Sequence, residues 1–224
     1  MRDECQKKLN LFKAPHRSAK DRLDLLNSLD DPTLTPTQDY FEFGKEYFDT
    51  PGLQRGYSGY YYDGRYADTA RSIATHYGLT SGSTVLEIGC AKGFLLVEFL
   101  KIGVGVVGVD RSNYAVSNAH PDVKQFITVS KSIDAQLPDE VDLSIAKEVL
   151  SHMPLDEVIS TITRLREIAK NRLYVVSTVS DQHTDAKVMK DWDPTFITNL
   201  KKQEWNELFA KYDPEAYFQF SVII

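Results

Sequence analysis

Short apolar runs alternate with amphipathic segments along most of this 224-residue chain. Runs of valine, leucine and isoleucine that end at glycine or polar residues are typical of strands buried on both faces of a sheet. They predict strands at 84–88, 105–109, 124–129, 141–146 and 172–178. The segments between and after them predict helices at 93–101, 113–118, 155–170 and 201–211. This alternation favours an α/β fold with a doubly wound, mostly parallel sheet.

Residues 1–66 differ in composition from the rest of the chain. Leucines recur at helical intervals within 21–30, which predicts a short amphipathic helix there. Aromatic residues and glycines are then concentrated between 39 and 66, where they either pack this segment onto the main domain or cover a ligand. A helix at 67–77 leads into the first strand. We therefore divide the chain into an N-terminal helical extension, 1–66, and an α/β domain, 67–224.

A glycine-containing turn follows the first predicted strand. Glu87 lies at the end of that strand, and Gly89 and Gly93 flank the loop that precedes an apolar helix. The second strand ends in Asp110. Glycines let the backbone approach a ligand at the carboxyl end of a strand, and a carboxylate after the next strand accepts hydrogen bonds from ribose hydroxyls. The pattern predicts a nucleoside site.

The glycine spacing distinguishes between kinds of nucleoside. Dinucleotide-binding turns read G-x-G-x-x-G and place a pyrophosphate at a helix N-terminus, whereas this turn reads E-x-G-x-x-x-G. Residues 103–108 match G-x-G-x-x-G literally, but they lie before and inside the second predicted strand. No helix N-terminus faces a phosphate there, so these glycines are expected to form a turn and to allow close packing within the sheet.

The E-x-G-x-x-x-G turn, followed by a strand that ends in Asp110, resembles motif I of the class I S-adenosylmethionine (SAM)-dependent methyltransferases. The resemblance covers about residues 57–180. It implies a Rossmann-like sheet, mostly parallel with an antiparallel C-terminal strand, and SAM as the cofactor. In that family the turn holds the methionine part of SAM, the acidic residue holds the ribose, and a segment after the third strand reads the adenine.

The resemblance assigns cofactor contacts to residues near the ends of four predicted strands. They are Glu87, Gly89, Cys90, Ala91, Lys92 and Gly93 in the turn, Asp110 and Arg111 after the second strand, Ser132, Ile133 and Asp134 after the third, and Lys147 after the fourth. Small-molecule methyltransferases often cover the cofactor with an N-terminal lid. By that likeness Tyr57, Tyr60 and Tyr62 are expected to face the ligand, and Arg65 to pair with its carboxylate.

His152 lies just after the fourth predicted strand, where related small-molecule enzymes often place a catalytic histidine. Its ordinary pKa of about 6.5 suits a general base for a hydroxyl or ammonium acceptor. Glu148 is the other candidate base, and the alternative role for His152 is to cap or pack the start of the 155–170 helix. The stretch 191–194, Asp-Trp-Asp-Pro, either walls the acceptor pocket or is an ordinary loop anchored by its tryptophan.

Charge and cysteine content narrow the range of partners. The net charge of −6 and the lack of lysine- or arginine-rich runs argue against a nucleic-acid partner. Cys5 and Cys90 lie far apart, without a cysteine or histidine at metal-ligand spacing, so neither a disulfide framework nor a metal site is expected. The charged N-terminal residues and the absence of a long apolar run predict a cytoplasmic protein without a membrane partner. The sequence leaves the oligomeric state open.

The expected function is SAM-dependent methylation of an oxygen or nitrogen on a small metabolite, in a biosynthetic pathway. One alternative keeps the cofactor but uses its aminocarboxypropyl chain, by transfer or by cyclisation to azetidine-2-carboxylate with release of methylthioadenosine. The aromatic-rich lid favours that alternative, because aromatic rings stabilise a cation, and so does the absence of an unambiguous base. A second alternative is a catalytically silent SAM-binding partner subunit.

Overall fold

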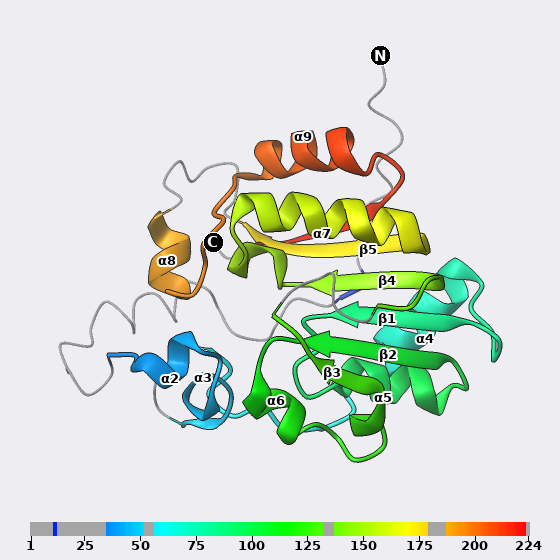
Figure 1. Cartoon of the computed structure of the whole chain (residues 1–224), viewed down its shortest axis with the longest axis horizontal. Coiled ribbons are helices and arrows are strands. Elements are labelled where there is room, and N and C mark those ends of the chain that lie inside the picture. Colours follow the sequence, from blue (N-terminus) through cyan, green and yellow to red (C-terminus); the bar gives the residue numbers. More distant parts are fainter. Residues whose placement is uncertain (1–10, 13–34, 52–55, 132–136, 179–186, 223–224) are drawn as a thin grey trace.

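A six-stranded sheet with the strand order β3-β2-β1-β4-β5-β6 organises the computed structural model of this chain (Figure 1). The structure describes residues 11–12, 35–51, 56–131, 137–178 and 187–222. The strands are β1 (Thr84–Ile88), β2 (Gly105–Asp110), β3 (Ile127–Val129), β4 (Val141–Lys147), β5 (Ala169–Thr178) and β6 (Tyr217–Val222). Every pair of neighbouring strands runs parallel.

Helices cover both faces of the sheet, which is the doubly wound, Rossmann-like arrangement expected from the sequence. Two of them, α4 (Ala67–Tyr77) and α5 (Phe94–Lys101), pack on one face, and α7 (Leu155–Ile168) and α9 (Lys202–Tyr212) pack on the other (Figure 1). Shorter elements complete the fold: α2 (Gln38–Phe41), α3 (Lys45–Asp49), α6 (Asn113–Ser117), α8 (Lys187–Trp192) and the 3-10 turns η2 (Lys124–Phe126) and η3 (Leu150–His152). Within the described ranges, no helix combines the length and the apolar character needed to span a membrane.

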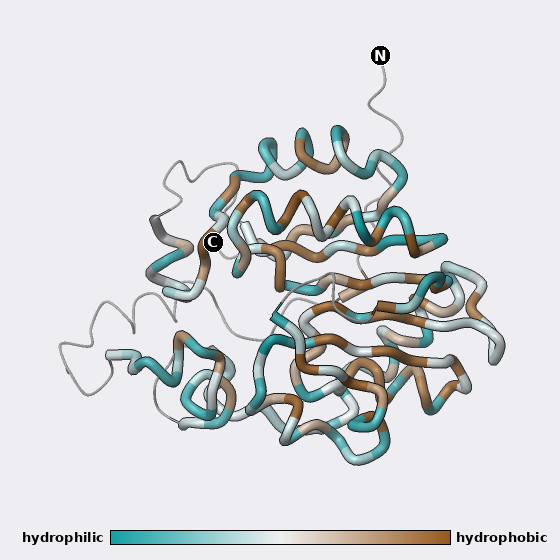
Figure 2. The backbone as a smooth tube through the Cα atoms, in the orientation of Figure 1, coloured by the Kyte–Doolittle hydropathy of each residue, from teal (hydrophilic) through white to brown (hydrophobic). Residues whose placement is uncertain are grey.

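Successive residues of the central strands pack into two separate cores, one under each helical layer. Val85 of β1 contacts the α4 and α5 side, whereas its neighbour Leu86 belongs to the core beneath α7 and α9. Figure 2 shows the resulting concentration of hydrophobic residues along the inner strands and the more hydrophilic outer helical surfaces. Burial on both faces explains why these strands read as continuous apolar runs.

The final strand runs in the opposite direction to the one expected. Leu173 of β5 pairs with Tyr217 of β6, and Thr178 pairs with Val222, so the two strands are parallel and the expected antiparallel C-terminal strand is wrong. The reason is α9, which lies between them in the chain and returns it to the end of the sheet at which β5 begins. A helix crossover of this kind joins parallel strands.

The strand expected at 124–129 is also shorter than predicted. Residues 124–126 form the 3-10 turn η2, and only Ile127 to Val129 pair with β2 as β3. Ile127 is the one buried residue of this strand, which lies at the edge of the sheet. An edge position leaves little apolar surface to bury, so less of the segment is held in an extended form.

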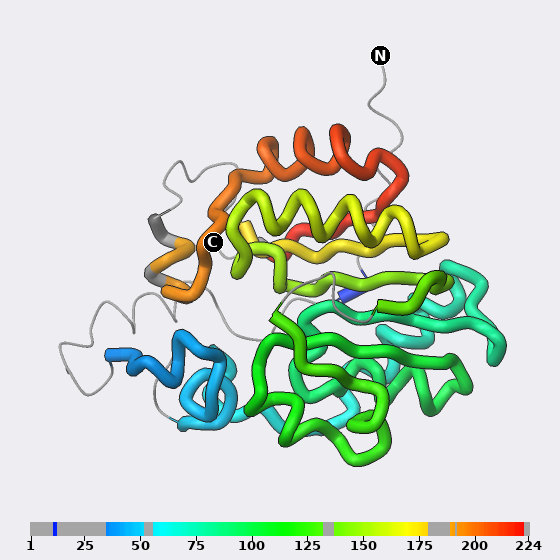
Figure 3. Tube along the Cα trace, in the orientation of Figure 1, coloured from blue at the N-terminus to red at the C-terminus, as the bar shows by residue number. Residues whose placement is uncertain are grey.

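Aromatic residues attach the N-terminal segment to the sheet. Tyr40, Tyr47 and Phe48 of α2 and α3 are buried in a cluster with Ala91 and Phe94 of the main domain. Figure 3 shows these first two helices, in blue, beside the green segment that contains α6. The helix predicted at 21–30 lies outside the described residues, and the domain boundary at residue 66 stays a prediction.

Residues 11–12 also contact the sheet, at its last strand. The backbone N–H groups of Leu11 and Phe12 donate to the Gln219 side-chain oxygen at 3.1 and 3.2 Å, and the Gln219 amide donates back to the Phe12 carbonyl at 2.8 Å. The Phe12 ring is buried, and Lys147 Nζ lies 5.8 Å from its centroid. Two ends of the described chain therefore meet beside the end of β4.

Candidate functional site

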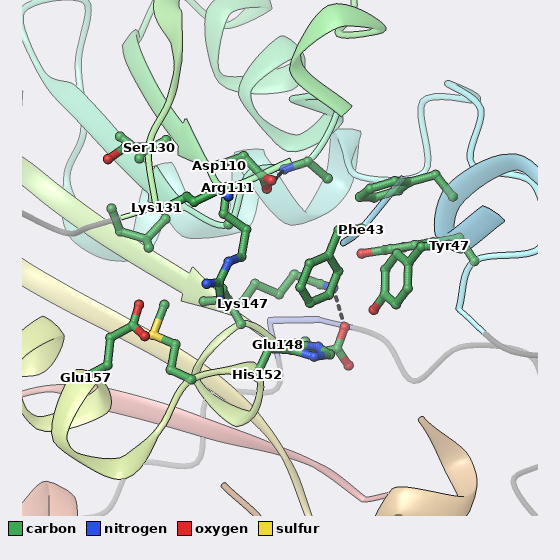
Figure 4. Close-up of a pocket in the computed structure, with 18 residues that line it drawn as sticks. Phe43, Tyr47, Asp110, Arg111, Ser130, Lys131, Lys147, Glu148, His152 and Glu157 are labelled. Carbon is green, nitrogen blue, oxygen red and sulfur yellow. Dashed lines mark hydrogen bonds and ion pairs between the residues drawn. The ribbon is translucent and has the colours of Figure 1, made fainter. Parts of the chain in front are cut away.

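A cleft of about 770 Å³, counting its open side, lies at the carboxyl ends of β1, β2 and β4 (Figure 4). The predicted cofactor-site residues that line it are Tyr57, Gly89, Ala91, Asp110, Arg111 and Lys147. The two candidate bases, Glu148 and His152, also line it. Phe43, Tyr47 and Phe48 contribute aromatic rings from the N-terminal segment. This position, outside the carboxyl ends of parallel strands, is where open α/β sheets bind ligands.

Gly89 requires glycine for both conformation and packing. Its φ is +70°, in the left-handed region, and a Cβ placed there would lie 2.5 Å from Cγ2 of Val149. Gly93 has a φ of +75°, and its Cβ would lie 2.7 Å from Cδ1 of Ile127. The turn therefore approaches the segment after β4 and the start of β3 more closely than a larger residue allows.

The glycines of the 103–108 stretch have a packing role, as expected. A Cβ on Gly108 would lie 2.7 Å from Leu96 Cδ1 and 2.8 Å from Cys90 Sγ. Gly103 has a φ of +83° and forms the turn after α5. Cys90 is a buried residue of the motif I turn, and burial raises the pKa of its thiol well above the ordinary value. Its side chain is a packing group and does not line the cleft.

The Asp110 carboxylate fixes the motif I turn to the end of β2. It accepts hydrogen bonds from the backbone N–H of Ala91 at 2.7 Å and of Ser112 at 2.8 Å, one on each oxygen. Burial raises the pKa of Asp110, and these two backbone bonds oppose that shift. Each carboxylate oxygen keeps acceptor capacity, so the group can still receive hydroxyl donors from the cleft.

Glu87 is a buried carboxyl group without a complete set of partners. Its Oε2 has no hydrogen-bond partner in the part of the chain that the structure describes. Burial raises the pKa of Glu87 to about 8, while Lys147 opposes the shift and Asp110 adds to it. A neutral, underused carboxyl beneath the glycine turn is suited to a cationic group brought by a ligand. The residues present therefore fit SAM, which carries an α-ammonium group and ribose hydroxyls.

Lys147 and Glu148 form an ion pair at the end of β4. Lys147 Nζ lies 2.6 Å from Glu148 Oε2, and the dashed line in Figure 4 marks this pair. Lys147 lowers the pKa of Glu148, against the effect of burial. Glu148 also has a left-handed φ of +54°, and its N–H donates to the Val175 carbonyl at 2.7 Å. Paired in this way, Glu148 is a poor general base, which leaves His152 as the better candidate.

The structure separates the predicted lid residues into two groups. Tyr57 lines the cleft, and its ring lies 4.2 Å from that of the buried Tyr60. Tyr62 lies outside the lining, because its hydroxyl bonds Glu98 and Lys101 of α5.

Arg65 likewise does not line the cleft. Its guanidinium bonds the Asp63 carboxylate at 2.8 Å near the surface. The structure therefore does not bring this cation toward the motif I turn. Opening and closing of the 57–65 lid stays a prediction.

Lys92 holds the N-terminal segment against motif I instead of lining the cleft. Its ammonium lies 2.6 Å from the Asp49 carboxylate and donates to the Tyr60 carbonyl at 2.8 Å. The Tyr114 hydroxyl donates to the same carboxylate at 2.7 Å. The adenine segment predicted at Ser132, Ile133 and Asp134 lies outside the described residues, while the adjacent Ser130 and Lys131 line the cleft.

His152 is buried at the wall of the cleft among aromatic rings. Its ring meets those of Phe43 and Phe196 with centroid separations of 5.5 and 4.8 Å. Nδ1 lies 2.9 Å from the Thr195 hydroxyl oxygen. Burial lowers the pKa of His152, and the nearby Asp193 opposes that shift. The imidazole is therefore kept neutral, which is the form that a general base needs.

Most of the chain, residues 59–215, matches the sequence family described as a methyltransferase domain. The chain belongs to that family. This match, together with the fold, confirms the resemblance that motif I indicated.

Curated relatives of this chain include ubiquinone biosynthesis O-methyltransferases. The one from Rhodopseudomonas palustris (strain BisB18) is 31% identical over 108 residues, and the one from Bradyrhizobium diazoefficiens is 33% identical over 107 residues. These matches cover 45% and 44% of this chain and 41% of each relative. The chain therefore spans about two fifths of the length of the curated relatives that it matches.

Solved structures share the fold of this chain at low sequence identity. A SAM-dependent methyltransferase from Archaeoglobus fulgidus aligns with a TM-score of 0.51 and 14% identity. That alignment covers 78% of this chain and 73% of the other. It shows a common sheet architecture.

Two parts of the candidate site were not predicted from the sequence motifs. The first is a pair of rings from the N-terminal segment, Phe43 in the turn between α2 and α3 and Tyr47 in α3, which were noted only as aromatic residues. The second is Thr195, which follows the Asp-Trp-Asp-Pro stretch and contacts His152. The sequence offered one indication of Thr195, because the adjacent Asp-Trp-Asp-Pro stretch was already a possible wall of the acceptor pocket.

Proposed function

We propose that this protein transfers the methyl group of SAM to a phenolic hydroxyl of a small molecule, with His152 as the general base. The observation that supports it most directly is the shared cleft. Residues of the motif I turn, the carboxylate that follows β2 and the imidazole of His152 all line one cavity. Holding a nucleophile and a methyl donor together in such a cavity contributes roughly 7–11 kcal/mol to the rate.

The chain's own residues would hold SAM from three sides. The backbone of the Gly89–Ala91 turn would contact the methionine part, Asp110 would accept the ribose hydroxyls, and Glu87 would face the ammonium group. When bound, SAM supplies a methyl group already activated by its sulfonium centre. Asp110 is held in place by two backbone N–H groups, so it needs no rearrangement to receive the ribose.

The choice of a phenol rests on the state of His152. Burial lowers the pKa of this imidazole below 6.5, so it is a weak base. Full transfer of a proton from a phenol of pKa about 10 to a base of pKa about 6.5 costs roughly 5 kcal/mol. A hydroxyl as weakly acidic as water would cost roughly 13 kcal/mol. The difference favours phenols over aliphatic alcohols.

The walls of the cleft support the same class of acceptor. Phe43, Tyr47, Val149 and Met153 supply aromatic and apolar surface near His152. A flat aromatic acceptor would contact this surface while its hydroxyl meets the base. The curated relatives named as O-methyltransferases also support an oxygen acceptor. A cytoplasmic location and a role in biosynthesis belong to the same proposal.

Three probes with the same ring test the acceptor chemistry. Purified protein is incubated with SAM and catechol, benzyl alcohol or benzylamine, and the nucleoside product is identified by mass spectrometry. We expect S-adenosylhomocysteine with catechol and much less with the other two. His152→Ala should slow turnover by roughly 10²–10⁴-fold without changing the affinity for S-adenosylhomocysteine. The control is His76→Ala, at an exposed helix end, which should leave turnover intact.

Other products would contradict the proposal in distinct ways. Methylthioadenosine would show chemistry at the aminocarboxypropyl chain. Binding of S-adenosylhomocysteine without any nucleoside product would show a silent SAM-binding subunit. Methylation of benzylamine alone would replace the oxygen acceptor by nitrogen.

A further inference from the structure

We propose that Thr195 and Asp193 form a relay that fixes the tautomer of His152, with the proton on Nδ1 and Nε2 left as the basic nitrogen. This inference rests on the proposed function for the role of the base, but the tautomer itself is a property of the free protein. Thr195 and Asp193 are positioning residues, because they act on a substrate only through His152.

Asp193 is a buried carboxylate surrounded by donors. It accepts four hydrogen bonds from residues that the structure describes. Two come from Thr195, from its backbone N–H at 3.0 Å and its hydroxyl at 2.7 Å. Two come from the hydroxyls of Tyr40 and Tyr47, each at 3.1 Å. Asp193 is the acceptor in all four of these bonds, and a carboxylate has no proton to donate.

The direction of the Thr195 hydroxyl decides the direction of the next bond. A hydroxyl carries one proton, and here that proton is donated to Asp193. The oxygen of Thr195 is then an acceptor toward His152, at 2.9 Å from Nδ1. Nδ1 must therefore carry a proton. With Nδ1 engaged in this way, Nε2 is the ring nitrogen left to receive a proton in the cleft.

Tyr47 cannot reverse the direction of these hydrogen bonds, because its hydroxyl does not become an acceptor toward Asp193. Burial and the neighbouring Asp193 raise the pKa of Tyr47 well above its ordinary value, so its hydroxyl stays protonated and remains a donor. The Thr195 backbone N–H and both tyrosine hydroxyls already donate to Asp193, and the Thr195 hydroxyl is the fourth donor to this carboxylate. The network thus has one consistent arrangement of protons.

Backbone contacts hold the loop of Thr195 in register with His152. The N–H groups of Ile197 and Thr198 donate to the Ser151 carbonyl at 2.8 and 3.0 Å. The Thr198 hydroxyl donates to the Met153 carbonyl at 2.7 Å. Bonds on both sides of His152 therefore fix the distance between its ring and the loop. A positioning role needs this rigidity, because an imidazole that rotates loses its alignment with the acceptor.

The relay also sets the basicity of His152. Burial lowers the pKa of His152, as does Arg111 after β2, whereas Asp193 on the loop after α8, a backbone hydrogen bond with Thr195 and Glu148 after β4 raise it. Tyr47 of α3, whose ring centroid lies 6.3 Å from that of His152, stays neutral. When His152 accepts a proton at Nε2, the Nδ1–H donor strengthens its bond to Thr195 and, through it, to Asp193. Removing the Thr195 hydroxyl takes away this stabilisation of the charged form.

Nuclear magnetic resonance of protein labelled with ¹⁵N-histidine tests the tautomer directly. The His152 signals are assigned by their loss in His152→Ala. At a pH above the histidine pKa we expect protonated Nδ1 and unprotonated Nε2 in the wild type. Thr195→Val keeps the side-chain shape but removes the hydroxyl, and it should shift His152 toward the Nε2–H form. Thr195→Ser keeps the hydroxyl and should keep the wild-type tautomer.

Kinetics with catechol and SAM supply the second measurement. Thr195→Val should lower kcat by roughly 10- to 100-fold, with little change in the KM for SAM, and should move the acidic limb of the pH–kcat profile to lower pH. Thr195→Ser should restore both. A change caused only by lost packing would not be rescued by serine, which is smaller, and would not move the pH profile.

The outcomes separate this inference from the proposed function. An Nε2–H tautomer in the wild type, or the wild-type tautomer in Thr195→Val, overturns the relay even if His152→Ala abolishes turnover. If the relay shows the expected tautomers but His152→Ala retains full turnover, the positioning of His152 stands and its role as base is refuted. If Thr195→Val unfolds, the wild-type spectrum and Thr195→Ser still decide the tautomer.

Discussion

Replacing Gly89 by alanine tests how the motif I turn is packed. The substitution has two costs. A non-glycine residue at a φ of +70° loses roughly 1–2 kcal/mol. A Cβ 2.5 Å from Cγ2 of Val149 must also push that side chain or the backbone aside, and overpacking of this kind costs roughly 1–3 kcal/mol. We therefore expect Gly89→Ala to lower the free energy of unfolding by roughly 2–5 kcal/mol.

Two further variants separate these costs. Gly78 has a similar φ of +64°, but a Cβ there would have no neighbour within 4 Å, so Gly78→Ala measures the conformational part alone. Val149→Ala removes the two methyl groups, at 2.5 and 3.4 Å from the new Cβ, but keeps the Val149 Cβ, at 2.7 Å. The double variant Gly89→Ala/Val149→Ala should therefore recover only part of the packing cost, which gives a coupling energy of roughly 0.5–2 kcal/mol.

Urea unfolding followed by circular dichroism measures the free energies of unfolding of the wild type and the four variants at one pH. The reasoning fails if Gly89→Ala costs no more than Gly78→Ala, or if the effects of Gly89→Ala and Val149→Ala simply add. Either result would mean that the contact with Val149 does not require glycine. Binding of S-adenosylhomocysteine to the double variant, measured by calorimetry, then shows whether a turn partly relieved of this collision still holds the ligand.

Three other expectations concern charged residues of the site. Asp110→Ala should weaken S-adenosylhomocysteine binding by roughly 10- to 100-fold, as lost charge-assisted bonds worth roughly 1.5–3 kcal/mol imply, and an unchanged dissociation constant in calorimetry would misplace the ribose. Because burial raises the pKa of Glu87 from 4.5 to about 8, the folded protein binds a proton that the unfolded chain releases in this range, so stability should fall as pH rises from 4.5 to 8. Urea titrations should show that Glu87→Gln has a smaller fall, and equal slopes would contradict the burial argument. Lys92→Met should speed hydrogen exchange in 38–49, because the ion pair with Asp49 is lost, while unchanged exchange there would show that the aromatic cluster alone holds the segment.

The central strands were predictable because burial on both faces leaves a direct record in the sequence. Val85 and Leu86 enter different cores, so both must be apolar, and consecutive apolar residues occur in β1 and β2. Motif I was predictable for a related reason, since the left-handed turn at Gly89 excludes other residues locally. Such features depend on neighbours in the sequence.

Features that depend on distant contacts were not predictable. The direction of β6 follows from the path of α9, and no residue of β6 itself specifies it. Phe43 and Tyr47 are not arranged on one periodic helical face, because Phe43 lies in the turn between α2 and α3 whereas Tyr47 belongs to α3. From these two positions they contact His152 and Asp193. The contact between Thr195 and His152 joins residues more than forty positions apart, and nothing in either local sequence indicates it.

The contact between Phe12 and Gln219 has a consequence for the order in which the molecule is completed during synthesis. Its two partners are separated by 207 positions in the chain, so the contact cannot form until the last strand has left the ribosome. Phe12 precedes the whole sheet in the chain, yet its ring is buried only once β6 is in place. Its ring lies beside Lys147, which lines the cleft. A nascent chain can therefore form the motif I turn before β6 has been made, but this side of its binding cleft is completed only after β6 has joined the sheet.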